Sequence, residues 1–222
     1  PRRRVLLTSN SARAYIGPAS ALSENYAKAL DAFIERSCAR SKISPVVALF
    51  HAVRNIPYFS SGDRTPEAVL RDNRGACTAK HILLRDLLRR IGESADVEII
   101  EGDFAASMPQ VSTMPEALRS WISSGGITDY HCYVVWRGPE REQILDATWH
   151  DSLSAYRFAV NSEWNGEGDT RLAILPTFVK SRVEDVVSRK EKLLQSLTRE
   201  EIHNRKLFLA LLSEWLAELP KE

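Results

Sequence analysis

Hydrophobic residues that recur every three or four positions predict a chain rich in helices. The clearest such stretch begins at Cys77, continues to about Arg90 and is closed by Ile91-Gly92, because glycine commonly follows the last turn of a helix. Ser44-Pro45 starts another helix, with serine as N-cap and proline at the first helical position. The last helix begins with the capping box Thr198-x-x-Glu201. The predicted helices span residues 23–39, 45–55, 66–70, 77–90, 115–122, 183–194 and 198–219.

Three further stretches are typical of β-strands. Residues 95–101 alternate between apolar and polar side chains, and residues 129–136 are aromatic and β-branched between glycine-containing turns. Residues 143–149 follow the turn at 137–141 and are expected to pair with 129–136 as an antiparallel hairpin. Residues 102–126 are predicted to form a loop with one short helix, and residues 150–170 to be irregular. The predicted fold class is therefore α+β.

Cys77 is expected at the mouth of its helix. There the thiol meets unpaired backbone N–H groups and the positive end of the helix dipole, which both favour the thiolate. The backbone N–H of Cys77 is left free to bind an oxyanion. Gly75, two residues earlier, suits a tight entry turn and lets a substrate backbone approach. Alone, the position is also compatible with a small buried hydrophobic residue.

The predicted hairpin supplies two partners for this thiol. His131 lies near the start of the first strand and Asp146 near the end of the second, so antiparallel pairing brings an imidazole and a carboxylate together. A base and the group that orients it must be neighbours in this way. Cys77, His131 and Asp146 are therefore the candidate catalytic residues.

These three segments, in this order, resemble a known family. Gly75-x-Cys77 at the start of a helix, Asp129-Tyr130-His131 at the start of a strand and Leu145-Asp146-Ala147-Thr148-Trp149 are similar to the transglutaminase-like superfamily of papain-like cysteine enzymes. The resemblance covers roughly residues 45–150. It implies a nucleophile helix packed on an antiparallel sheet, with additional N- and C-terminal helices, and a Cys77-His131-Asp146 triad.

The same resemblance defines the type of reaction better than it defines the substrate. Its members include transglutaminases, proteases, peptide N-glycanases and amide-forming enzymes, so cysteine-dependent acyl transfer from an amide, ester or thioester is expected. Water as acceptor would make the chain a hydrolase, and an amine would make it a transamidase or amide synthase. The implied partners are a peptide, protein or small-molecule acyl donor and an amine acceptor. No metal or organic cofactor is implied.

Two rival assignments use the same part of the chain. His81 lies four residues after Cys77 on the same helix face and is an alternative base, although it has no orienter nearby. Zinc bound by Cys77, His81, His131 and Cys132 is a second alternative; against it, residues 131 and 132 point to opposite strand faces, and the chain has no C-x-x-C pair.

Other candidate residues have simpler interpretations. Cys38 and Cys132 are interpreted as packing residues, and Tyr130 and Trp149 as core aromatics that flank the triad. Arg71 and Arg74 precede the nucleophile; they are solvated loop charges or contacts for an acidic substrate group.

Composition changes this picture little. A net charge of +1 gives no reason to expect a nucleic-acid partner, and the cluster Arg2-Arg3-Arg4 is interpreted as a solvated end. No apolar run approaches the ~20 residues that cross a bilayer, so no membrane association is expected. Three widely separated cysteines favour a reducing compartment, the cytoplasm.

The chain is expected to divide into a catalytic domain, residues 1–180, and a helical appendage packed on it, residues 181–222. A non-catalytic alternative uses the same fold as an interaction module, with the apolar stripe of the last helix as its docking surface. That stripe comprises Ile202, Leu207, Leu209, Leu211, Leu212, Trp215 and Leu216.

Overall fold

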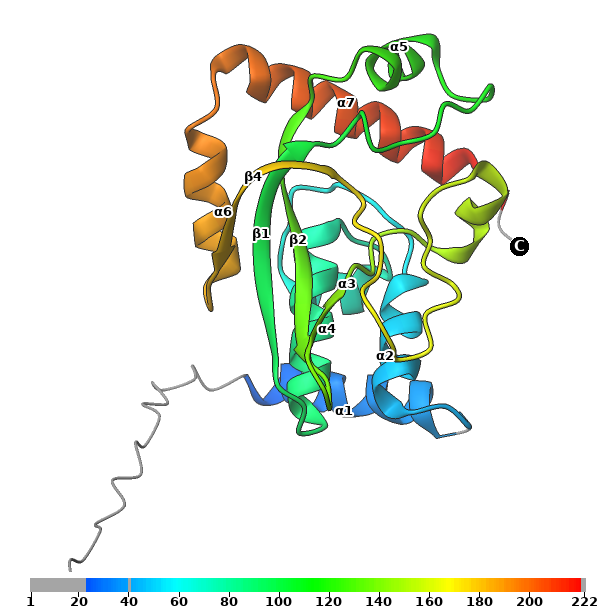
Figure 1. Ribbon diagram of the computed structural model, residues 1–222, viewed down its shortest axis with the longest axis vertical. Helices are drawn as coiled ribbons and strands as arrows, with labels where there is room; N and C mark the ends of the chain where they lie inside the picture. Colours follow the sequence, from blue (N-terminus) through cyan, green and yellow to red (C-terminus); the bar gives the residue numbers. More distant parts are fainter. Residues whose placement is uncertain (1–22, 40, 221–222) are drawn as a thin grey trace, which may run out of the picture.

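The computed structural model describes residues 23–39 and 41–220, in which helices and one curved sheet alternate along the chain (Figure 1). The elements before the sheet hairpin are α1 (Glu24–Cys38), α2 (Pro45–Arg54), α3 (Pro66–Asp72), α4 (Cys77–Arg90), β1 (Ala95–Asp103) and α5 (Glu116–Ser124). They are followed by β2 (Thr128–Arg137), β3 (Glu142–Leu145), the 3-10 helix η1 (Asp151–Tyr156), β4 (Leu175–Arg182), α6 (Val186–Gln195) and α7 (Arg199–Glu218).

The sheet is antiparallel throughout, with strand order β3-β2-β1-β4. The long strands β1 and β2 pair over their whole length, from Ala95 opposite Trp136 to Asp103 opposite Thr128. The short β3 pairs only with the second half of β2, where Val134 lies opposite Leu145. This register leaves the first half of β2, which carries His131, free on that side for the chain that follows β3.

Two cores hold the helices to the sheet. The first lies between α1, α2, α4 and one sheet face, and Leu83, Leu87 and Val134 within it are completely buried. The second joins the opposite sheet face to α5, α7 and the segment after β3, around Phe104 and Phe208. Each fully buried side chain of this size contributes about 1.5–3 kcal/mol. Cys132 belongs to the first core and Tyr133 to the second, as strand alternation requires.

The predicted helices are confirmed, with small shifts at their ends. Helix α4 begins at Cys77 as expected, and Gly92 after it has φ +89°, the left-handed conformation that ends a helix. Thr198 and Glu201 form the expected capping box of α7. The α+β class and the packing of the nucleophile helix on an antiparallel sheet are likewise confirmed.

Three predictions of secondary structure need correction. Strand β3 ends at Leu145 and not at Trp149, because Asp146 turns its backbone N–H to the Thr170 hydroxyl instead of to β2. The segment 150–170 is not wholly irregular, since it contains η1. The edge strand β4 was not predicted at all: residues 175–178, its first four, are all exposed and so show no alternation of buried and exposed side chains.

The two C-terminal helices complete the fold. Helix α7, orange to red in Figure 1, crosses one end of the sheet near α5. Of its predicted apolar stripe, Leu209, Leu212, Trp215 and Leu216 are buried in the second core, together with Phe208, whereas Leu207 is exposed. The expected domain boundary at residue 180 falls inside β4, and the division of the chain stays a prediction. The cluster Arg2-Arg3-Arg4 lies outside the described residues. Among the described residues, no helix combines the length and apolar character that a membrane crossing requires.

Candidate active site

Cys77 is the first residue of α4, and the structure buries it almost completely. The residue before it, Ala76, has no side chain that can cap the helix, so the N–H groups of the first turn are not used by a side-chain acceptor. The thiol is thus placed at the positive end of a helix, and its residue is 4% exposed.

The approach to Cys77 is held by backbone pairing. Gly75 donates its N–H to Pro57 O at 3.0 Å and accepts from Phe59 N at 3.2 Å, forming a short parallel bridge. A Cβ on Gly75 would lie 2.7 Å from Val69 of α3. Glycine is therefore needed here for helix packing, which the sequence interpretation as an entry turn did not include.

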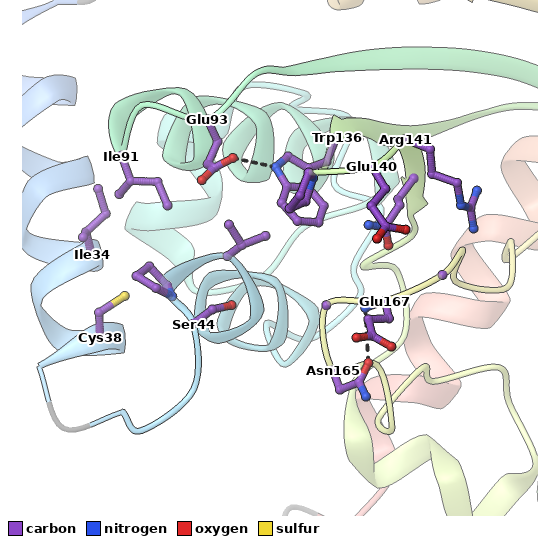
Figure 2. Close-up of a pocket in the computed structure, with 16 residues that line it drawn as sticks. Ile34, Cys38, Ser44, Ile91, Glu93, Trp136, Glu140, Arg141, Asn165 and Glu167 are labelled. Carbon is purple, nitrogen blue, oxygen red and sulfur yellow. Dashed lines mark hydrogen bonds between the residues drawn. The ribbon is translucent and has the colours of Figure 1, made fainter.

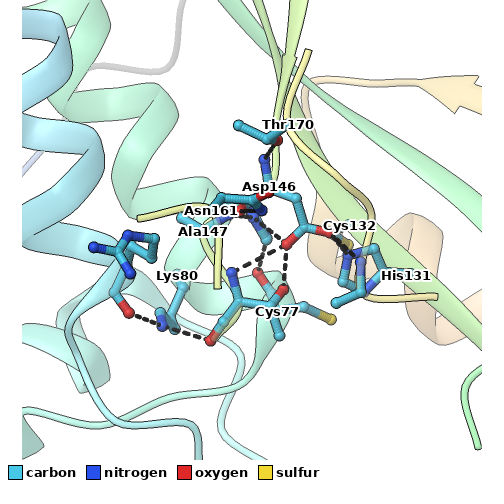
Figure 3. A network of polar contacts seen from close by, with 12 residues as sticks. Cys77, Lys80, His131, Cys132, Asp146, Ala147, Asn161 and Thr170 are labelled. Carbon is cyan, nitrogen blue, oxygen red and sulfur yellow. Dashed lines mark hydrogen bonds and ion pairs between the residues drawn. The ribbon is translucent and has the colours of Figure 1, made fainter. Parts of the chain in front are cut away.

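The structure brings His131 and Asp146 together as the hairpin argument predicted. The imidazole Nε2 lies 2.7 Å from Asp146 Oδ2, and both side chains are 1% exposed (Figure 3). The other ring nitrogen, Nδ1, is buried and makes no hydrogen bond with any described residue. It is the nitrogen that remains for the thiol of Cys77.

Asp146 is held as a carboxylate by four donors. Its Oδ1 accepts from the Thr148 N–H at 3.0 Å and from the Thr148 hydroxyl at 2.6 Å. Its Oδ2 accepts from the Ala173 N–H at 2.7 Å in addition to His131. Burial disfavours the charged form, but the charge of His131 and these hydrogen bonds outweigh it and lower the pKa of Asp146 to about 2.

The thiol and the imidazole favour an ion pair. A hydrogen bond from the Cys132 thiol holds the pKa of Cys77 well below its usual value, and the charges of Lys190 and His131 act in the same direction against burial. Burial opposes the charged imidazole, yet Asp146 and the Cys77 thiolate raise the pKa of His131 to about 10. Both shifts favour thiolate and imidazolium over the neutral pair.

Lys190 is a residue of this site that sequence reasoning missed. It lies on α6, its side chain is 3% exposed, and its Nζ is 3.6 Å from Cys77 Sγ and 3.9 Å from Asp129 Oδ1. Asp129 is also bound by Arg205 of α7 through two hydrogen bonds of 2.8 and 3.1 Å. The available signal was a lysine four residues after the buried Val186, where the apolar face of the helix calls for a hydrophobic residue.

Both ring nitrogens of His81 are engaged elsewhere, which argues against this residue as the base. Its Nδ1 donates to the Cys77 carbonyl oxygen at 2.7 Å, and its Nε2 accepts from the Ala147 N–H at 2.8 Å. Burial lowers the pKa of His81 to about 4, so the ring is neutral. His81 thus ties the nucleophile turn of α4 to the residue that follows Asp146.

The same two engaged nitrogens argue against His81 as a zinc ligand. Among the described residues, no group of three or more histidine, cysteine or acidic side chains is arranged to hold a metal ion. Cys132 Sγ lies 3.5 Å from Thr78 Oγ1. All three cysteines are free thiols.

Lys80 links the nucleophile helix α4 to neighbouring segments through hydrogen bonds. It is fully buried, and its Nζ donates to the carbonyl oxygens of Arg54, Ile56 and Thr148 at 3.0, 2.7 and 2.9 Å. These oxygens belong to the end of α2 and to the segment after β3, so a single ammonium joins three parts of the chain that surround the site (Figure 3).

Three hollows differ in their relation to the triad. A cavity of about 20 Å³ adjoins Cys77 and is lined also by Tyr58, Asp129, Lys190 and Arg205. Tyr58 also lines an open hollow of about 860 Å³, which includes Arg74 and His150. The hollow in Figure 2, about 870 Å³, lies at the other end of α4 near Cys38 and Trp136 and includes none of the triad.

Of the residues predicted to flank the triad, the two aromatic residues are buried, and the two arginines contact neighbouring side chains. Trp149 is buried and packs on Tyr58, with ring centres 5.0 Å apart, and Tyr130 is a buried core residue. Arg71 pairs with the adjacent Asp72. Arg74 stacks on Phe59, with its guanidinium carbon 4.1 Å from the ring centre, and faces the 860 Å³ hollow.

Comparisons with known proteins give little beyond this geometry. No protein-family model matches the chain, and no curated protein matches it. One similar solved structure is described as a TGase, a transglutaminase: identity is 14%, the TM-score is 0.41, and the match covers 58% of this chain and 34% of that one. Another is a Cytophaga hutchinsonii protein provisionally described as a cysteine protease, with 14% identity, a TM-score of 0.38 and coverage of 71% and 49%.

The chain thus spans about a third and about half of the length of these two proteins. Both descriptions fall within the enzyme classes that the sequence resemblance implies. Because both TM-scores are below 0.5, the functional conclusion below rests on the geometry of Cys77, His131 and Asp146 alone.

Proposed function

We propose that this protein is a transglutaminase-like cysteine hydrolase or acyltransferase that acts on an amide, ester or thioester carbonyl through a thioacyl-enzyme intermediate. The observation that carries the proposal is the His131–Asp146 bond of 2.7 Å, which leaves Nδ1 of a buried imidazole without a partner beside a thiol at a helix N-terminus. Nucleophile, base and orienter require this arrangement.

The proposed reaction proceeds in two displacements. The Cys77 thiolate attacks the carbonyl carbon of the donor, and the imidazolium of His131 gives its proton to the leaving amine, alcohol or thiol as the carbon–heteroatom bond breaks. Water or an amine then attacks the thioester and gives a proton to His131 as the carbon–sulfur bond breaks. Asp146 fixes the ring tautomer throughout and stabilises the charged imidazole. The Cys77 backbone N–H supports the developing oxyanion.

The donor is proposed to approach from the hollow of about 860 Å³. Tyr58, which is 4% exposed, lines both that hollow and the small cavity beside Cys77. The small cavity, about 20 Å³, has room for about one water molecule. A carbonyl group therefore reaches the sulfur only after Tyr58 and its neighbours move, as in enzymes that assemble a dry site on substrate closure.

The non-catalytic alternative loses its proposed docking surface. An interaction module was expected to present the apolar stripe of α7, but four of the seven stripe residues, Leu209, Leu212, Trp215 and Leu216, pack into the second core. The buried nucleophile is the one observation that favours this alternative, because a closed site needs an opening step before it can act. A reducing compartment such as the cytoplasm is proposed, since a free thiol nucleophile requires one.

Acylation of Cys77 by defined donors tests the proposal. Wild type is incubated with a nitrophenyl ester, a peptide amide and an acyl thioester, each with and without a primary amine, and the intact mass and products are followed. At least one donor is expected to give an acyl adduct on Cys77, lost in Cys77→Ala and in His131→Ala. Cys38→Ala is the matched control, because Cys38 lines the distant hollow and must leave acylation unchanged.

Two outcomes decide between the candidates. Turnover only when amine is present identifies an acyltransferase, and turnover without amine identifies a hydrolase. Absence of any adduct from all three donors, while iodoacetamide still labels Cys77, refutes the enzyme proposal and favours the interaction module.

A further inference from the structure

Lys190 places a buried ammonium group against the candidate nucleophile from the C-terminal part of the chain. Its Nζ lies 3.6 Å from Cys77 Sγ, within the reach of an N–H···S contact, and its residue is 2% exposed. Lysine is almost never fully buried unless it is paired, because removing its charge from water costs several kcal/mol. Its partners therefore show what the lysine is for.

The nearest carboxylate is already taken. Asp129 accepts two hydrogen bonds from Arg205, at 2.8 and 3.1 Å, and also accepts from the Tyr130 N–H. Lys190 stands farther from it, 3.9 Å away. One carboxylate thus faces two cations, and the positive charge in excess lies beside the sulfur of Cys77.

Charge balance in the site favours an anion at that sulfur. The buried groups Asp129 and Asp146 are negative, and Arg205, His131 and Lys190 are positive. Ionising Cys77 makes three charges of each sign. Among the other described titratable groups near the thiol, none supplies a further negative charge: His81 and Tyr58 are neutral, Cys132 is a thiol, and Arg64 pairs with Glu191. Burial lowers the pKa of Lys80 to about 7, and any charge it carries adds to the positive excess.

We propose that Lys190 is a further catalytic residue, which holds Cys77 as a thiolate in the resting protein and binds the oxyanion that forms next to the sulfur during acyl transfer. Lys190 and the first turn of α4 line the same cavity of about 20 Å³, a volume suited to one oxygen atom. The Cys77 N–H is one donor at that cavity, and Lys190 is the second. The oxyanion half of this role rests on the proposed function, whereas the thiolate half does not.

The pH dependence of Cys77 alkylation, together with the ultraviolet absorbance of the thiolate, tests the thiolate half without any substrate. Lys190→Met keeps the aliphatic part of the side chain and leaves Asp129 paired with Arg205. It is expected to raise the apparent pKa of the Cys77 thiol by about 1 to 3, the effect of removing an opposite charge within ~4–6 Å. Lys190→Arg is expected to restore a pKa near that of wild type.

Lys192→Met is the matched control, because Lys192 is an exposed lysine on the same helix and is expected to leave the profile unchanged. An unchanged pKa in Lys190→Met, or a failure of Lys190→Arg to restore it, overturns the proposal. If the methionine variant does not fold, His131→Gln decides instead: with Lys190 as the remaining cation, its thiol pKa must stay below the ~8.5 of a free cysteine, and a value at or above that refutes the role.

The two proposals can fail separately. A chain that no donor acylates, but in which Lys190→Met raises the thiol pKa, loses the proposed function and keeps the electrostatic role. In a chain that turns over a donor, Lys190→Met is expected to lower kcat at a pH where its thiol is fully ionised, with Lys190→Arg retaining more of it. If Lys190→Met and wild type have the same kcat at that pH, Lys190 does not bind the oxyanion.

Discussion

Asp146→Asn is the substitution for which the structure makes the sharpest prediction. Asparagine has the shape of aspartate, but one of its two terminal groups is a donor. In the native site both oxygens of Asp146 accept from a backbone N–H: Oδ1 from Thr148 and Oδ2 from Ala173. Either orientation of the amide therefore turns an NH₂ group toward a backbone N–H. Neither orientation satisfies both.

The cost follows from the number of donors left without an acceptor. At least one backbone N–H and one amide N–H lose their partners in a site that is 1% exposed. Each buried unsatisfied donor costs about 1–3 kcal/mol, so the variant is expected to be less stable by about 2–5 kcal/mol. In urea, with a slope of about 2–3 kcal/mol per molar, the unfolding midpoint falls by about 1–2 M.

Urea unfolding followed by tryptophan fluorescence measures this shift. Asp185→Asn is the matched control: Asp185 is the N-cap of α6 and accepts from the Ser188 N–H, and asparagine caps equally well. Its midpoint is expected to stay within about 0.2 M of wild type. If Asp146→Asn unfolds at the wild-type midpoint, the carboxylate is not held by these four donors and the orienter assignment is wrong.

Three other measurements test separate parts of the structure. His131→Ala is expected to abolish acylation and raise the pKa of Cys77. His81→Ala is expected to lower the unfolding midpoint but to retain acylation, because His131 remains as the base. A folded but inactive His81 variant beside an active His131 variant contradicts this assignment. The folded-state pKa of His131, about 10 against 6.5, predicts a contribution that is complete below pH 6.5 and lost as pH rises toward 10. The folded-state pKa of Asp146, about 2 against 3.8, predicts a contribution to stability that is complete above pH 3.8 and is lost as pH falls from there through 2. Urea titrations of wild type against His131→Gln should therefore converge at high pH, and a constant difference refutes the assignment. Lys80→Met leaves three buried carbonyl groups without a donor and is expected to cost about 3–5 kcal/mol in the same assay, while an unchanged midpoint excludes the role of Lys80 as a fastening group.

Much of this site could be predicted because its information is local. A serine before a proline, a capping box and a glycine after an apolar run set helix ends through the residues at those ends. The apolar repeat that follows Cys77 placed that residue at the start of α4. The hairpin then joined residues 131 and 146 across one turn. Local rules of this kind act over a few residues.

The features that the sequence analysis did not predict depend on contacts between residues far apart in the chain. Ala173 holds Asp146 through its backbone N–H, which every residue type except proline has, so its identity carries no signal. Strand β4 is an edge strand with an exposed Phe178, which gives the sequence no buried face to show. Lys190 meets Cys77 across 113 positions of the chain, and only tertiary packing relates the two.

The order of these elements along the chain has a consequence for synthesis. Residues 77–146, which contain the thiol, the imidazole and the carboxylate, are translated before α6 and α7 bring Lys190 and Arg205 to the site. Chains grow at about 5–20 residues per second, so for several seconds the nascent chain lacks both late cations. Over that interval the thiol is expected to be more protonated and less reactive than in the finished protein. The thiol is thus expected to reach its full reactivity only after the last two helices have been synthesised and have folded onto the sheet.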